Sequence, residues 1–193
     1  MAVSKIYKKI FAAFILLFLI SNRAYSYDDG FASARRIDSR HFTVYYAPKL
    51  DAGTLAQQLN ITLADKILAG GGTAGTDASE LGLRDMLDTF FSRVCDILDM
   101  QLYSFKGTIK VCQDYAQLNQ VYQNLFDNGL EGKLSFYVYP LNTIYISADS
   151  FKREVLGHEI AHAIISHYFV VQTPMKIQEI LAGYVEYQLR KSK

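Results

Sequence analysis

The chain has few of the residues that mark specialised sequence classes. Its 193 residues contain no tryptophan, three prolines, two cysteines and four histidines. So few prolines, together with only 12 glycines, exclude collagen-like and low-complexity sequences. A hydrophobic content of 50% excludes a mainly disordered chain. The length suits one ordinary domain.

A strong charge of one sign is also missing, because the formal net charge is +1. The charges are unevenly placed. Residues 1–26 contain four basic residues and no acidic one, whereas residues 27–193 contain 16 basic and 19 acidic residues, a net charge of −3. A nucleic-acid-binding domain needs a basic surface. We therefore expect no nucleic-acid partner for residues 27–193.

The first 26 residues are typical of a secretory signal peptide. Three lysines precede an uninterrupted apolar run over residues 10–20, and small residues follow at Ala24 and Ser26. The run has 11 residues, whereas a membrane-spanning helix needs about 20. We predict cleavage after Ser26 and export of residues 27–193, periplasmic or secreted, with no further membrane span. An uncleaved N-terminal membrane anchor is the alternative.

Both cysteines, Cys95 and Cys112, lie in the part predicted to be exported. An oxidising compartment would allow them to form a disulfide. Two buried free thiols are the alternative. A disulfide needs the two Cα atoms within about 7 Å, which sequence does not reveal, so both alternatives stay open here.

Residues 27–193 alternate between strand and helix patterns. Strand-forming runs cover residues 41–46, 108–112, 134–139 and 143–147, the last two as a hairpin. Helical spacing of apolar residues covers residues 55–68, 83–98, 115–126, 151–168 and 174–190. Residues 28–40 show no regular pattern, and the glycine-rich residues 70–75 indicate a loop. These patterns predict one α+β domain over residues 27–193, in which a small, mostly antiparallel sheet packs with helices.

The chemistry is concentrated in the segment His158-Glu159-Ile160-Ala161-His162. On a helix, His158 and His162 lie one turn apart on the same face, where two imidazoles can hold one Zn²⁺. Glu159 lies about 100° around that helix from His158, so its carboxylate can reach a water molecule on the metal without binding the metal. The metal would acidify that water, and Glu159 would take its proton. The segment therefore predicts a zinc-dependent hydrolase with Glu159 as the catalytic base.

A catalytic zinc site usually has three protein ligands and one open position. The segment Gln178-Glu179-Ile180-Leu181-Ala182-Gly183-Tyr184 resembles that of the gluzincins, zinc metallopeptidases whose third ligand is a glutamate on the helix after the H-E-x-x-H helix. The resemblance covers residues 142–187. It implies that Glu179 is the third ligand and that Ala182 is a small packing residue. Gly183 departs from the family, because many members have an acid there that hydrogen-bonds a ligating histidine, and Glu186 is a candidate substitute.

The same resemblance implies where a peptide substrate would bind. In the family, the strand before the metal-binding helix is an edge strand that pairs with an extended peptide. Carried over by position, the substrate-binding residues would be Asn142, Thr143, Ile144, Tyr145, Ile146 and Ser147. The C-terminal end of the domain would then consist of the metal-binding helix and the glutamate helix.

Two features leave alternatives open. In the last helix, an apolar stripe of Ile177, Ile180, Leu181 and Tyr184 points roughly away from Glu179, so a solvated acidic face is an alternative role for that glutamate. A non-catalytic, zinc-stabilised peptide-binding or structural module is the alternative to a metallopeptidase acting on peptides or proteins. Glu159 favours the enzyme, since a structural site needs no base. Hydrolysis of another amide or an ester is a third possibility, and the sequence indicates neither the cleavage specificity nor the oligomeric state.

Overall fold

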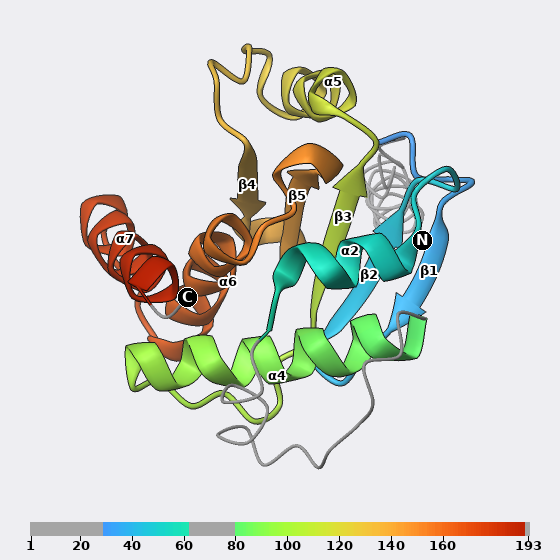
Figure 1. The fold of residues 1–193 in the computed structure, drawn as a ribbon. Coiled ribbons are helices and arrows are strands. Elements are labelled where there is room, and N and C mark those ends of the chain that lie inside the picture. The colour runs from blue at the N-terminus through green and yellow to red at the C-terminus, as the bar shows by residue number, and fades with distance from the viewer. Residues whose placement is uncertain (1–28, 62–79, 192–193) are drawn as a thin grey trace, which may run out of the picture.

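A five-stranded sheet forms the centre of the fold (Figure 1). The computed structural model describes residues 29–61 and 80–191, so the predicted signal peptide and the glycine-rich loop lie outside the described residues. The helix predicted over residues 55–68 ends at Leu59, because Asn60 adopts a left-handed backbone conformation there, and residues 62–68 of the prediction lie outside the described residues. The strands are β1 (Arg35–Asp38), β2 (Phe42–Tyr46), β3 (Gly107–Cys112), β4 (Ser135–Val138) and β5 (Thr143–Ser147). The helices are α2 (Ala52–Leu59), α4 (Glu80–Leu98), α5 (Tyr115–Phe126), α6 (Arg153–Tyr168) and α7 (Met175–Lys191). Within these residues, no helix is long and apolar enough to cross a membrane.

The sheet is mixed, with the strand order β1-β2-β3-β5-β4. Its outer pairs, β1 with β2 and β4 with β5, are antiparallel, whereas β2 pairs parallel to β3 and β3 pairs parallel to β5. Parallel neighbours need crossover connections. Helices α2 and α4 lie between β2 and β3 in the chain, and α5 lies between β3 and β5. The predicted α+β class is confirmed, as is the β4–β5 hairpin, but the sheet is not mostly antiparallel.

Strand β5 lies inside the sheet, which corrects the predicted substrate strand. It pairs with β3 on one side and with β4 on the other, and all of its residues are buried. A peptide can add only to a strand edge with free backbone groups. The prediction that an edge strand formed by Asn142, Thr143, Ile144, Tyr145, Ile146 and Ser147 binds substrate is therefore wrong. The edge strand on this side of the sheet is β4.

The two cysteines lie in separate parts of the core. Cys95 of α4 belongs to the larger core, which is formed where α2, α4 and α6 cover one face of the sheet and α7 packs against α6. Cys112 of β3 belongs to the smaller core under α5. Side chains alternate along a strand, so Val111 faces the larger core and Cys112 faces the other side. Both thiols are free, so of the two alternatives left open by the sequence the structure has two buried free thiols. Burial raises the pKa of Cys95 to about 11 and that of Cys112 to about 12.

Helix α6 lies between the sheet and α7 (Figure 1), and one glycine lets the two helices approach closely. A Cβ atom on Gly157 would lie 2.2 Å from Cδ1 of Leu189 and 3.2 Å from Cζ of Phe90. Gly157 thus brings α7 and α4 against α6 one residue before His158. A Cβ atom on Gly183 would meet nothing within 4 Å, so Gly183 does not create this close contact.

Helix α7 buries a different face from the one that its apolar stripe indicates. The buried residues of α7 are Gln178, Ala182, Val185 and Leu189. Within the predicted stripe, Ile177, Ile180 and Tyr184 are exposed, and Leu181 alone packs partly against the core. The burial of Ala182 agrees with its predicted packing role. The exposed stripe means that α7 is held by a face containing small and polar residues.

Candidate metal centre

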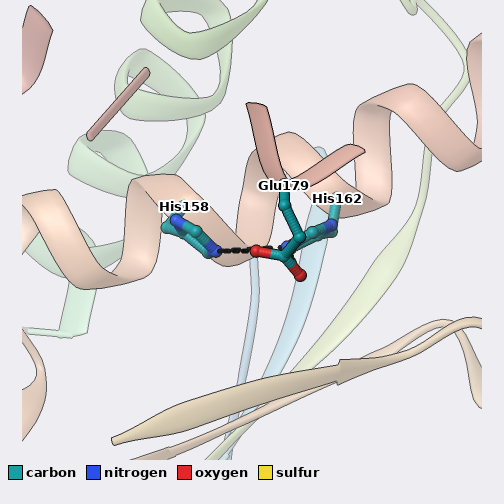
Figure 2. A group of neighbouring side chains, drawn as sticks. All are labelled: His158, His162 and Glu179. Carbon is teal, nitrogen blue, oxygen red and sulfur yellow. Dashed lines mark hydrogen bonds and ion pairs between the residues drawn. The ribbon is translucent and has the colours of Figure 1, made fainter. Parts of the chain in front are cut away.

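Two histidines of α6 form one side of the centre. Both rings project from the same side of the helix (Figure 2), because residues four positions apart lie on one helical face. The two Nε2 atoms are 3.2 Å apart. His162 is buried, and burial lowers the pKa of its imidazole. The neutral imidazole is the form that binds metals.

Glu179 of α7 completes the group. Its Oε2 atom lies 3.5 Å from Nε2 of His158, and its Oε1 atom lies 3.5 Å from Nε2 of His162 (Figure 2). Tetrahedral zinc with bonds of 2.0–2.1 Å needs ligand atoms separated by about 3.3 Å. Among the described residues, these three side chains are the group whose spacing could hold a metal ion. The separations and the two-imidazole, one-carboxylate donor set therefore fit zinc.

Gln178 positions the His162 ring, and its role was missed in the sequence. Its Oε1 atom lies 3.4 Å from Nδ1 of His162, and its Nε2 atom donates a hydrogen bond of 2.8 Å to the carbonyl oxygen of Thr173. The amide orientation thus presents an acceptor to His162, which favours a proton on Nδ1 and leaves Nε2 free for a metal. The available signal was a glutamine in helical phase with Ala182, Val185 and Leu189.

Glu186 occupies the corresponding place beside His158. Its Oε2 atom lies 3.3 Å from Nδ1 of His158, and its Oε1 atom forms an ion pair with Nη2 of Arg190. Nδ1 of His158 is buried and makes no hydrogen bond of good geometry within the described structure. Glu186 is therefore close enough to orient His158 after a small rotation. Gly183 has no side chain that could contact a histidine, and the carboxylate of Glu186 lies beside the His158 ring.

Glu159 is buried beside the ligand group without belonging to it. Its Oε1 atom accepts a hydrogen bond of 2.7 Å from the hydroxyl group of Ser135 on β4. Burial raises the pKa of Glu159 to about 7, and the bond from Ser135 opposes part of that rise. A carboxylate with a pKa near neutrality is suited to take up and release a proton. Ser135 was not singled out in the sequence, because its contact depends on how β4 lies against α6.

A cavity of about 450 Å³ joins these groups to the edge of the sheet. On one side it is lined by Leu134, Ser135, Phe136 and Tyr137, which include most of β4. On the other side it is lined by His158, Glu159, His162 and Glu179. This volume lies in the range of small-ligand pockets. The third histidine of α6, His167, lies outside the ligand group and contacts the carbonyl oxygen of Ala163, as its position on the helix indicates.

Comparisons with protein-family models, with curated proteins and with solved structures found no match to this chain. The gluzincin resemblance therefore stays a prediction. The geometry of the site is the basis for assigning a function.

Proposed function

We propose that the protein is an exported zinc metallopeptidase. The observation that carries the proposal is a buried carboxylate, Glu159, which Ser135 holds at the wall of the cavity that also contains His158, His162 and Glu179. A metal site that only stabilises a fold has no use for an additional buried acid. Burying such an acid is costly unless it is hydrogen-bonded or serves a function.

Three side chains from two helices would hold the zinc ion. His158 and His162 would bind through Nε2, and Glu179 would bind through its carboxylate, with Gln178 and Glu186 orienting the two rings. Zinc held by three protein ligands acidifies water and polarises a carbonyl group. The positive charge of the ion would also lower the pKa of Glu159 from its value in the metal-free protein.

Glu159 would move the proton during hydrolysis. The hydrogen bond from Ser135 engages its Oε1 atom, so Oε2 is the oxygen available to take a proton from the attacking water. The same carboxyl group would then deliver the proton to the leaving amine. Ser135 fixes the orientation of the carboxylate throughout and does not itself react.

The substrate would lie along β4 in place of the strand predicted from the sequence. Strand β4 is at the end of the sheet, and its residues line the cavity together with the metal-binding side chains. An extended peptide adding to that edge would satisfy free backbone groups of β4 and bring a peptide bond into the cavity. Peptides and proteins are therefore the substrate class that we favour.

A zinc-stabilised module without activity is the second candidate. It is favoured by the way in which Glu179 links α7 to the histidines of α6, because a metal there would clamp the two helices together. Hydrolysis of another amide or an ester would use the same residues in the same roles.

Zinc content and hydrolysis of a broad peptide library test the proposal together. We expect about one zinc ion per chain, cleavage of some peptides, loss of cleavage with a chelator and recovery with added Zn²⁺. Stoichiometric zinc without hydrolysis of peptides, amides or esters would support the structural module. Cleavage that survives complete removal of metal would contradict the proposed function.

A further inference from the structure

Exposed apolar side chains gather on the hairpin formed by α6, α7 and the loop between them. The described chain has 16 exposed large apolar side chains, and nine of them lie between residues 168 and 187. We define these nine as the hairpin surface: Tyr168, Phe169, Val170, Val171, Met175, Ile177, Ile180, Tyr184 and Tyr187. Single exposed apolar residues are ordinary, but a group of this size marks a binding surface.

The loop contributes the most exposed part of this surface. Val170 and Val171 have exposed fractions of 104% and 78%, and they follow Phe169 at the end of α6. Three consecutive apolar residues of the turn are therefore exposed, directly after the exposed Tyr168 at the end of α6. Because these side chains protrude from the turn, a binding partner could bury them without any change in the fold.

The helix contributes a stripe that continues from the loop. Ile177, Ile180, Tyr184 and Tyr187 follow one another at intervals of three or four residues, which places them on one face of α7. That face is separate from the buried one, and α7 lies at the margin of the molecule with α6 on its inner side (Figure 1). Helix α7 therefore carries exposed apolar side chains on its outer face, in addition to the mixed inner face that packs against α6.

The charge of the hairpin is opposite to that of the rest of the domain. Residues 168–193 contain four basic and two acidic residues, a net charge of +2. Residues 27–167 contain 12 basic and 17 acidic residues, a net charge of −5. Lys176 and Lys191, which are both exposed, lie at the two ends of the apolar stripe. An anionic surface would attract the hairpin and repel the rest of the domain.

We propose that the hairpin surface docks on an anionic lipid bilayer. Protruding aliphatic residues, tyrosines along one helical face and lysines at its ends match the side chains that enter the acyl boundary, the interface and the headgroup layer. Residues 1–26, an apolar run behind three lysines, would add a second membrane-binding element only where they are retained as the N-terminal anchor. Because Met175 also lines the cavity, docking would place the cavity mouth beside the bilayer.

Hydrogen–deuterium exchange on the full chain tests this contact locally, since vesicle pelleting alone would also report on residues 1–26. The measured quantity is the exchange rate of the backbone amides of residues 170–173. It is compared without vesicles, with phosphatidylcholine vesicles, and with vesicles of equal parts phosphatidylcholine and phosphatidylglycerol. We expect exchange at these amides to slow by roughly tenfold or more on the anionic vesicles and by less on the neutral ones.

A matched pair of double variants distinguishes binding through the hairpin surface from nonspecific hydrophobic adsorption. Val170→Ser with Ile180→Ser should remove most of the protection, whereas Leu81→Ser with Tyr103→Ser, which alters exposed apolar residues elsewhere, should keep it. Unchanged exchange on anionic vesicles, or equal protection on neutral ones, would overturn the proposal. Protection without vesicles would also overturn it, indicating a second copy of the chain if it rises with protein concentration and coverage by residues 1–26 if it does not.

Discussion

Helices α6 and α7 together form the candidate metal centre, but the two helices differ in how much of their apolar surface is buried. Helix α6 is apolar nearly all round and mostly buried, so Glu159 and His162 are buried on it, while His158 is partly exposed and lines the cavity with them. Helix α7 packs through Gln178, Ala182, Val185 and Leu189, and leaves most of its larger apolar side chains exposed. In α7 the apolar stripe therefore did not identify the buried face. The buried face of this helix also carries Gln178, which contacts the site.

The largest expected effect concerns the ligands. His162→Ala should reduce bound zinc from about one per chain to near zero, because it removes one of the three proposed ligands. Glu179→Ala should also weaken binding strongly, while leaving the two imidazoles of α6. Zinc content after gel filtration measures both.

The third histidine of α6 provides the control for that experiment. His167→Ala changes the same residue type on the same helix, outside the ligand group, and should keep about one zinc ion per chain. If His167→Ala empties the site as fully as His162→Ala does, the metal is bound elsewhere.

The next effect tests which face of α7 is buried. Leu189→Ala removes a fully buried side chain and should lower the free energy of unfolding by about 2–5 kcal/mol. Ile180→Ala alters an exposed side chain and should change it by less than about 0.5 kcal/mol. Urea unfolding of the two variants measures the difference. A cost for Ile180→Ala equal to that for Leu189→Ala would mean that the apolar stripe is buried after all.

Smaller changes in metal affinity are expected from the residue that orients His158. Glu186→Gln keeps the shape of the side chain but removes the charge beside Nδ1, and should lower zinc affinity by about 10–100-fold. Glu154→Gln, which removes the same charge one helical turn before His158, is the control and should leave the affinity nearly unchanged. Competition with a chromophoric chelator measures both affinities, and equal losses would reduce the role of Glu186 to general electrostatics.

The smallest expected effects are changes in the free energy of unfolding, and they have opposite signs in the two helices. Gly157→Ala in α6 forces a Cβ atom against Leu189 and Phe90, and should cost about 1–3 kcal/mol. Gly183→Ala in α7 meets open space, and should stabilise the protein by about 0.5–1 kcal/mol through helix propensity. Thermal or urea unfolding gives both values. Stabilisation by Gly157→Ala would show that α6 and α7 are less closely packed than described.

Local patterns predicted much of the fold and half of the site. The spacing of His158 and His162 is decided within one helical turn, so it could be recognised from the sequence alone. Helix α5 and the β4–β5 hairpin were likewise predicted, because their signals are local. Strand β1 was missed because Arg35, Arg36 and Asp38 leave Ile37 as its one apolar residue.

Other features that the sequence did not reveal concern relations between distant segments. The family resemblance placed strand β5 at an edge, whereas in the structure β3 pairs with its other side. Cys95 and Cys112 face different cores because of the side on which α4 packs. The contact of Ser135 with Glu159 joins two distant elements and left no signal in the local pattern, whereas Gln178 was indicated only by its helical phase with the buried residues of α7.

In the proposed mechanism, Glu159 acts as the catalytic base, whereas Glu179 binds the metal. The most direct test compares zinc content and peptide hydrolysis in Glu159→Gln and in the wild type. Because Glu159 lies outside the ligand group, the variant should keep about one zinc ion per chain and lose activity by a factor of about 10²–10⁴. A variant that hydrolyses peptides as fast as an active wild type would contradict the account.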